Sequence, residues 1–299
     1  MKIATRRSPL ALYQANLVKE LIESNSKDIH CILVPMTSEG DEVKGPLEDH
    51  GGKGLFIGSL ENALKTEQAD IAVHSLKDVP AELSDEFVIA ATLKREDPRE
   101  VFLSREGTSL NDKAMTIGSS SPRRKAQLLN KNPAHTIVPI RGNINTRIEA
   151  ITKQSLDGIM IANAAIKRLG IQYTGYLLEV SEMLPSASQG AIGIEVLKSN
   201  FTNEVEEILS GINCKDTFEE TKIERRFVAS MQGDCNSPIG CYCKIEQDKV
   251  FFSYQLLSLD GSQEVLNSIR LPTSDFENWL EKEIDMLYAT GKQKIIYDR

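Results

Sequence analysis

The sequence predicts an α/β protein in which two α/β domains flank a cleft and a smaller C-terminal α+β domain follows. Short apolar runs alternate with stretches of helical spacing up to about residue 210, a pattern typical of βαβ units and a largely parallel sheet. Polar segments at residues 94–99 and 185–190 flank one internal unit. After Asn213 the order changes to a helix, two alternating strands and a late helix, which indicates α+β.

The first α/β domain is expected to comprise residues 1–95 and 191–212. Ser8 is a suitable helix N-cap, and Pro9 suits the first helical position because the N–H that proline lacks is unpaired there. We therefore expect a helix over residues 9–23 after a strand at residues 3–5. The other expected elements are strands at residues 32–35, 71–74 and 87–92 and a helix at 57–66.

The second and third domains are expected at residues 96–190 and 213–299. Expected strands of the second domain are residues 101–103, 116–118, 137–140 and 159–162, and its expected helices are 122–130, 144–153 and 164–169. In the third domain we expect helices at 217–231 and 276–289 around strands at 239–245 and 250–259.

Composition excludes several classes of protein. The 299 residues are 40% hydrophobic and 26% charged, as in ordinary globular proteins. The net charge of −8, without aromatic residues among the basic clusters, argues against nucleic-acid binding. No apolar run reaches the length of a membrane span, and the N-terminus lacks the apolar stretch of a signal peptide. We therefore expect a cytoplasmic monomer without a nucleic-acid or membrane partner.

Cys235 lies in a loop, residues 231–240, that is rich in Gly, Asp, Asn, Ser and Pro. Such turn residues present a side chain instead of burying it, so this thiol is a candidate nucleophile or attachment point. Cys241 and Cys243 share one strand face nearby, but no Cys-x-x-Cys pair or neighbouring histidine supports a metal site, and none is expected. We expect Cys31 and Cys214 to be ordinary buried thiols.

Two turns in the second domain carry basic residues directly after a strand. Residues 118–124 combine a strand end, three serines, a helix start at Pro122 and two arginines, which together form a candidate anion site. Residues 141–147 repeat this arrangement after the next strand. A single turn of this kind could serve only to cap a helix, but two neighbouring turns indicate several carboxylates or phosphates bound side by side.

His74, Lys77 and Asp78 follow a strand of the first domain, at the sheet edge where α/β proteins bind ligands. The alternative is that Asp78 caps the next turn with Lys77 as its surface partner. Residues 51–54 read Gly-Gly-Lys-Gly, but Leu47 occupies the first glycine position of a Walker motif, so nucleotide hydrolysis is not expected. Residues 38–54 are either a mobile lid or a plain surface loop.

Ordered motifs through nearly the whole chain resemble the porphobilinogen deaminase family. They are ATRRSPLALYQA (4–15), GGKGLF (51–56), HSLKDVP (74–80), EDPR (96–99), SSSPRR (119–124), RGN (141–143), KRLG (167–170), QGA (189–191) and CNSPIG (235–240). The resemblance implies an enzyme whose first two domains are similar to periplasmic binding proteins. It implies the head-to-tail condensation of four porphobilinogen molecules into hydroxymethylbilane with release of ammonia. The implied cofactor is a dipyrromethane primer bound through a thioether to Cys235.

The resemblance also implies the roles of individual residues. Asp78 matches the catalytic carboxylate, which stabilises positive charge on pyrrole nitrogens. Each pyrrole carries an acetate and a propionate, so the growing chain is a polyanion that basic residues hold. The implied cofactor-binding residues besides Cys235 are Lys77, Asp78, Ser121, Arg123 and Arg124. The implied substrate-binding residues are Arg6, Gln14, Ser119, Arg141, Arg147 and Arg168.

Asp234 departs from the family pattern, in which glycine precedes the cysteine. Its charge beside the thiol disfavours the thiolate electrostatically. The other departures are Pro122 and Ser119, both compatible with a helix start. The alternative function is a non-catalytic anion-binding module in the same cleft, which predicts reversible carboxylate binding and no covalent adduct on Cys235.

Overall fold

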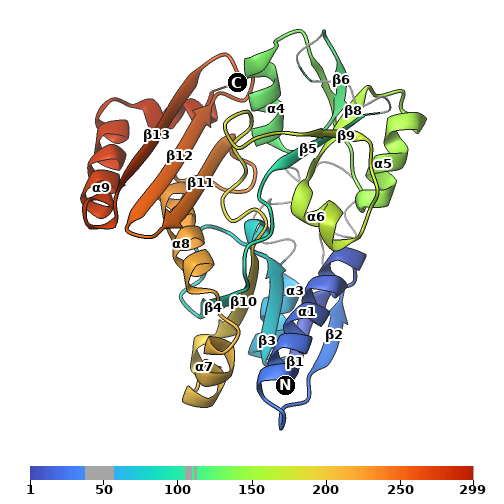
Figure 1. Ribbon diagram of the computed structural model, residues 1–299, viewed down its shortest axis with the longest axis vertical. Coiled ribbons are helices and arrows are strands. Elements are labelled where there is room, and N and C mark those ends of the chain that lie inside the picture. Colours follow the sequence, from blue (N-terminus) through green and yellow to red (C-terminus); the bar gives the residue numbers. More distant parts are fainter. Residues whose placement is uncertain (38–56, 105–109, 111–112, 299) are drawn as a thin grey trace. The chain divides into compact units, whose positions relative to one another are not determined.

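The computed structural model describes residues 1–37, 57–104, 110 and 113–298 (Figure 1). Its contacts divide the chain into two compact units, residues 1–96 with 190–219 and residues 97–189 with 220–299. The segment predicted to be a lid or a surface loop, residues 38–54, lies outside the described residues. Within the described part of the chain, no helix has both the length and the hydropathy needed to cross a membrane.

The sheet of the first unit has the strand order β2-β1-β3-β10-β4. Its strands are β1 (Lys2–Arg6), β2 (Ile32–Met36), β3 (Ile71–Ser75), β4 (Phe87–Thr92) and β10 (Ile192–Leu197). β1 is parallel to β2 and β3, whereas β10 is antiparallel to β3 and β4. The predicted parallel arrangement is confirmed for the first three strands, and β10, which returns after residues 97–189, runs the opposite way.

Helices cover both faces of this sheet. They are α1 (Pro9–Asn25), α3 (Gly58–Lys65) and α7 (Asn203–Ser210), with 3-10 helices η2 (Leu76–Asp78) and η3 (Lys198–Asn200). Because successive strand side chains point to opposite faces, Ile3 and Val73 pack with α1 and α7, while Ala4 and Ala72 pack with α3. Ser8 caps α1 as predicted, since its hydroxyl accepts a hydrogen bond from the Ala11 N–H at 3.3 Å. The sequence pattern did not indicate α7.

The five-stranded sheet of the second unit repeats the topology of the sheet in the first unit, with the strand order β7-β6-β8-β5-β9. Its strands are β5 (Glu100–Ser104), β6 (Thr116–Gly118), β7 (Thr136–Val138), β8 (Gly158–Ala162) and β9 (Gly175–Leu177). β6 is parallel to β7 and β8, and β5 is antiparallel to β8 and β9. Its helices are α4 (Pro122–Lys131), α5 (Ile144–Lys153) and α6 (Asn163–Arg168). The sequence therefore contains a structural duplication that its residue pattern did not reveal.

The C-terminal segment forms an antiparallel meander rather than the predicted pair of strands. Its elements are α8 (Lys215–Ser230), β11 (Ile239–Glu246), β12 (Lys249–Leu257), β13 (Glu264–Pro272), α9 (Thr273–Ala289) and η4 (Lys292–Tyr297). β12 pairs with both β11 and β13. Phe252 of β12 contacts Phe227 of α8, with ring centroids 5.4 Å apart, and Phe276 of α9, at 5.7 Å. Both helices therefore pack on this face of the sheet, which confirms the α+β class.

Candidate active site

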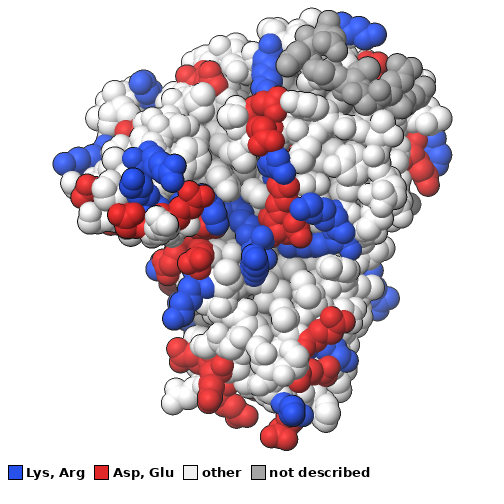
Figure 2. All heavy atoms as spheres, viewed as in Figure 1, with Lys and Arg blue, Asp and Glu red and all other residues white. Residues whose placement is uncertain are grey.

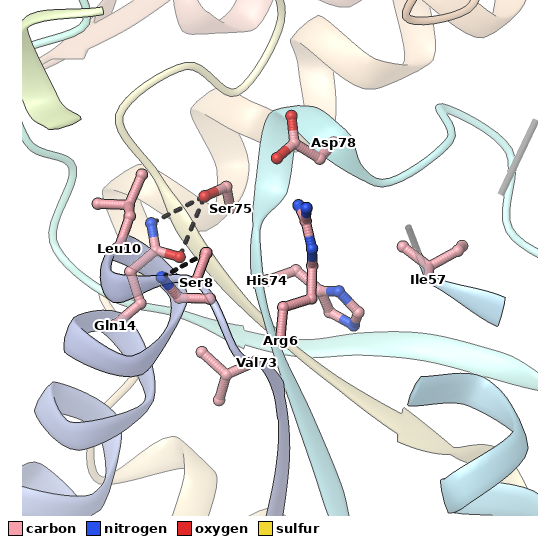
Figure 3. Close-up of a pocket in the computed structure, with 10 residues that line it drawn as sticks. Arg6, Ser8, Leu10, Gln14, Ile57, Val73, His74, Ser75 and Asp78 are labelled. Carbon is pink, nitrogen blue, oxygen red and sulfur yellow. Dashed lines mark hydrogen bonds between the residues drawn. The ribbon is translucent and has the colours of Figure 1, made fainter. Parts of the chain in front are cut away.

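The candidate residues of the first unit gather where β3 ends. Leu76 begins the one-turn helix η2 by donating its N–H to the carbonyl of Ala191 at 3.0 Å, which ties the turn to the start of β10. This turn leaves the Asp78 side chain exposed. Figure 3 shows Arg6 and Asp78 extending into one pocket, whose buried wall includes His74. A cation and a carboxylate thus line the same pocket, which suits a ligand that carries both an anionic group and a hydrogen-bond donor.

Gln14 fixes the end of β3 from the neighbouring helix. Its side chain on α1 is 1% exposed, and its Nε2 donates a hydrogen bond to Ser75 Oγ at 2.8 Å. The Ser75 hydroxyl donates in turn to Gln14 Oε1 at 3.0 Å. Gln14 therefore positions the residue from which η2 and Asp78 begin. Lys77 lies in the same 3-10 helix and is half-buried.

A buried pair lies in the β3 and β10 strands behind this pocket. His74 Nε2 is 2.8 Å from Glu195 Oε2, and the two side chains are 4% and 0% exposed. The pair spans a diagonal of the sheet, because His74 is directly opposite Gly193, two residues before Glu195. Burial raises the pKa of Glu61 on α3, and the charge of Glu195 raises it further. The strand that leads into Asp78 is thus held by a polar contact in the core.

In the second unit, the two arginine-bearing turns lie side by side. β6 and β7 pair in parallel, so the turns that follow them leave the same sheet edge. Ser121 caps α4 by accepting a hydrogen bond from the Arg124 N–H at 3.4 Å, and the Ser119 hydroxyl accepts from the Ser121 N–H at 3.2 Å. Ser120 Oγ links the turns by donating to the Ile140 carbonyl at 2.7 Å.

Arg123 and Arg124 turn inward from this edge. Arg123 Nη2 lies 2.5 Å from Glu100 Oε1, and Arg124 Nη2 lies 2.8 Å from Glu100 Oε2. Arg123 and Arg124 are only 4% and 7% exposed. The sequence indicated the anion-binding turn but not Glu100, which lies in a different strand. Its only sequence signal is its place directly after the EDPR motif.

The remaining arginines of the candidate site lie nearer the surface. Arg141 is exposed and precedes the N-cap of α5, where Asn143 Oδ1 accepts from the Thr146 N–H at 3.0 Å. Arg147 Nε donates to the Gly142 carbonyl at 2.8 Å, which closes the turn. Arg168 is the last residue of α6 and is half-buried.

Substituting Gly142 with alanine should distort the Arg141 turn. Gly142 has a φ of +99°, and an added Cβ would lie 2.9 Å from the Thr146 side chain. Gly170 is the matched control, because its φ is +63° and nothing lies within 4 Å of an added Cβ. We expect Gly142→Ala to lower the free energy of unfolding by about 2–3 kcal/mol and Gly170→Ala by about 1 kcal/mol, measured by urea denaturation. Equal losses would show that the Thr146 side chain moves away from the added Cβ without a measurable loss of stability.

Cys235 is the exposed member of the five cysteines; Cys31, Cys241 and Cys243 are buried, and Cys214 is half-buried. The expected burial is thus confirmed for Cys31 but only partly for Cys214. Asp234 shapes the turn that presents Cys235, because its Oδ1 accepts hydrogen bonds from the Asn236 N–H at 2.8 Å and from Ser237 Oγ at 3.2 Å. One oxygen of its carboxylate is thereby engaged within the loop.

Two tyrosines hold the residues that enter this loop. Tyr288 on α9 donates its hydroxyl to the Ser230 carbonyl at 2.6 Å, and Tyr297 donates to the Gln232 carbonyl at 3.1 Å. Gln232 has a φ of +54°, an uncommon conformation for a residue other than glycine. The tyrosine contacts therefore fix the chain where it turns toward Cys235. The sequence did not predict them, because they join residues 58 and 65 positions apart.

Comparison with known proteins identifies the family. The family model for "Porphobilinogen deaminase, dipyromethane cofactor binding domain" matches residues 1–205, and that for the C-terminal domain matches residues 218–274. The chain belongs to the porphobilinogen deaminase family. It is 41% identical over 280 residues to the porphobilinogen deaminase of Lawsonia intracellularis, covering 91% of this chain and 89% of the relative. It is 37% identical over 302 residues to that of Campylobacter hominis, covering 99% and 97%.

Membership in the porphobilinogen deaminase family confirms the expected activity: a transferase of tetrapyrrole biosynthesis that uses porphobilinogen and a dipyrromethane cofactor. Among solved structures, a periplasmic solute-binding protein of Pseudomonas putida with bound D-glucuronate gives a TM-score of 0.42 at 12% identity, over 78% of this chain and 81% of that one.

The side chains fit the chemistry of the cofactor. Cys235 offers an exposed thiol for a thioether. Arg123 Nε is buried and has no hydrogen-bond partner among the described residues, so a donor remains for a carboxylate oxygen. Within the described part of the chain, no group of three or more His, Cys, Asp or Glu residues could hold a metal ion.

Proposed function

We propose residue roles for hydroxymethylbilane synthesis by this chain, in which Cys235 carries the dipyrromethane and Asp78 is the catalytic residue. The observation that supports the attachment point most directly is the exposure of Cys235 in a fixed turn, while Cys241 and Cys243 on the adjacent strand are 0% exposed. A buried thiol cannot bond a bulky bipyrrole without local unfolding, so the exposed thiol is the one available for the thioether.

Asp78 acts on the charge that develops during ammonia release. When the carbon–nitrogen bond of the protonated aminomethyl group breaks, neutral ammonia departs and the positive charge passes to the pyrrole nitrogen. The Asp78 carboxylate accepts a hydrogen bond from that N–H and stabilises the charge in the transition state more than in the ground state. Its exposed position at the end of a short, backbone-anchored helix suits this role. A dipyrromethane attached at Cys235 would supply the terminal pyrrole carbon for the new carbon–carbon bond, and that carbon would then lose its proton to restore the aromatic ring.

The basic residues hold the carboxylates of the growing chain. In the first unit, Arg6 lines the Asp78 pocket and is placed to bind an acetate or a propionate there. In the second unit, Arg141 and Arg147 flank the α5 N-terminus, whose free N–H groups also favour an anion. We assign Gln14, Ser119 and Arg168 to the substrate, and Lys77, Ser121, Arg123 and Arg124 to the cofactor. Gln14 also positions Ser75.

We further propose three domains, residues 1–95 with 191–212, residues 96–190 and residues 213–299, because each region has a sheet of its own. We also propose that the protein is a cytoplasmic monomer that does not bind nucleic acid. The net charge of −8 supports the last point. Figure 2 shows acidic and basic side chains interspersed on the displayed face.

The intact mass of the purified protein tests the covalent attachment. We expect the wild-type mass to exceed the sequence mass by about two pyrrole units, because the thioether survives denaturation, and Cys235→Ser to show the bare mass. Cys214→Ser is the matched control and should keep the adduct, since Cys214 lies outside the loop. An adduct retained in Cys235→Ser would contradict the attachment point. An unmodified wild-type chain that stays unmodified after incubation with porphobilinogen would favour the reversible binding module.

A further inference from the structure

Glu100 is a buried carboxylate on which several side chains of the second unit converge. It lies at the start of β5 and is 0% exposed. Besides Arg123 Nη2 and Arg124 Nη2, it accepts hydrogen bonds from Arg124 Nε at 3.1 Å and from Gln189 Nε2 at 3.0 Å. Arg124 thus binds both carboxylate oxygens, which fixes the plane of its guanidinium.

Backbone carbonyls hold the other ends of both guanidiniums. Arg123 Nη1 donates to the Leu184 carbonyl at 2.6 Å, and Arg124 Nη1 donates to the Met160 carbonyl at 3.0 Å. The residue after Leu184 also contacts the strand that follows the Cys235 loop, because the Cys241 N–H donates to the Pro185 carbonyl at 2.9 Å. Arg123 and the start of β11 are therefore both bonded to residues 184–185, whereas Arg124 is bonded to β8.

The charges of these three side chains do not cancel. Two guanidiniums, which stay protonated in proteins, face one carboxylate, so their sum is +1. Burial lowers the pKa of Arg123, Glu100 opposes that effect, and the charge of Arg124 adds to it. An excess charge in a buried setting is costly, and a further anion would relieve that cost. The orphaned Nε of Arg123 and the N-terminus of α4 provide donors for such an anion.

We infer that Glu100 is a positioning residue that holds Arg123 and Arg124 in the geometry that binds one carboxylate of the dipyrromethane. This inference rests on the proposed function. Glu100 offsets one of the two charges, so the chain folds before the cofactor is attached, and it leaves the second charge for the cofactor. Without Glu100, the charges of Arg123 and Arg124 would be offset within this group only by the carboxylate of the cofactor.

The thermal midpoint of Glu100→Gln, with and without the cofactor, tests this role. Gln keeps the shape but leaves two buried guanidiniums uncompensated, so we expect the cofactor-free full chain to lose roughly 6–15 °C in Tm. The cofactor-loaded chain, sorted by intact mass, should lose less than half as much, because the cofactor supplies a carboxylate. Glu100→Asp should restore most of the loss, since it retains the charge.

Glu220→Gln is the matched control. Glu220 is a buried carboxylate of the same unit, 3.0 Å from Lys244 Nζ, and is not bonded to the arginine pair. Glu220→Gln should lower the Tm by the same amount in the cofactor-loaded and the cofactor-free protein. Equal losses for Glu100→Gln in the two forms would make Glu100 a structural ion pair and overturn the inference while leaving the function intact. A wild-type chain that never acquires the cofactor would overturn both.

Discussion

Asp78→Asn is expected to lower kcat by about 100-fold or more while the protein folds and carries its cofactor. Asparagine has nearly the same shape as aspartate, but it has no charge to oppose the cation that forms as ammonia leaves. The KM for porphobilinogen should change little, because arginines rather than Asp78 bind the substrate carboxylates. Initial rates of hydroxymethylbilane formation measure the effect, and intact mass and circular dichroism establish that cofactor and fold are present.

Asp85→Asn is the matched control for this measurement. Asp85 belongs to the same unit and is exposed, and it is not among the residues that line the Asp78 pocket. Its turnover should equal that of the wild type. If Asp78→Asn also turned over near the wild-type rate, the assigned role would be wrong, and the positive charge would have to be stabilised elsewhere. A parallel loss of kcat and of folded protein would instead assign Asp78 to the stability of η2.

Local chemistry explains which parts of the fold the sequence predicted well. The helix expected at residues 144–153 matches α5, because Asn143 caps it and its apolar residues recur at helical spacing. β9 is short and contains no fully buried residue, so no apolar run indicated it. β13 alternates between exposed and half-buried residues and has no fully buried face, so its pattern resembled a polar segment. The antiparallel direction of β5 and β10 depends on tertiary topology and leaves no trace in residue spacing.

The candidate site likewise contains residues that the local sequence identified and partners that only the folded structure reveals. Turn residues and strand ends identified Asp78, Ser121 and Cys235 as candidates, because their conformation depends on near neighbours. The partners that position them could not be predicted. Gln14 lies 61 residues from Ser75, and Glu195 lies 121 residues from His74. Such pairs depend on which strands and helices meet, and one sequence does not contain that information in any local pattern.

The pair formed by His74 and Glu195 leads to the second large effect. His74→Leu is expected to lower the free energy of unfolding by about 3–5 kcal/mol, because it leaves a carboxylate with 0% exposure without its hydrogen-bond partner. The other oxygen, Oε1, already has no partner among the described residues, so nothing nearby compensates. Denaturation in guanidinium chloride measures the loss.

The double variant His74→Leu with Glu195→Leu distinguishes the loss of the His74–Glu195 hydrogen bond from the loss of side-chain packing at the same site. Replacing both partners of a buried pair with apolar residues is often neutral, so the double variant should recover most of the loss. Glu195→Leu alone leaves an imidazole without its hydrogen-bond partner, which costs less than an unpaired carboxylate, and we expect a smaller loss of about 1–3 kcal/mol. Additive single losses would contradict this interpretation, since they would mean that the two side chains do not interact.

Glu61 provides an independent readout of the same pair. Its pKa is raised in the folded protein, by burial first and by Glu195 second, so the folded state binds its proton more tightly than the unfolded chain does. Its contribution to stability is therefore present below its unfolded pKa and is lost as pH rises through the raised folded pKa. Glu195→Leu removes the second cause, so stability should fall less steeply over this acidic range than in the wild type. An unchanged pH dependence would mean that the charge of Glu195 has no measurable effect on the pKa of Glu61.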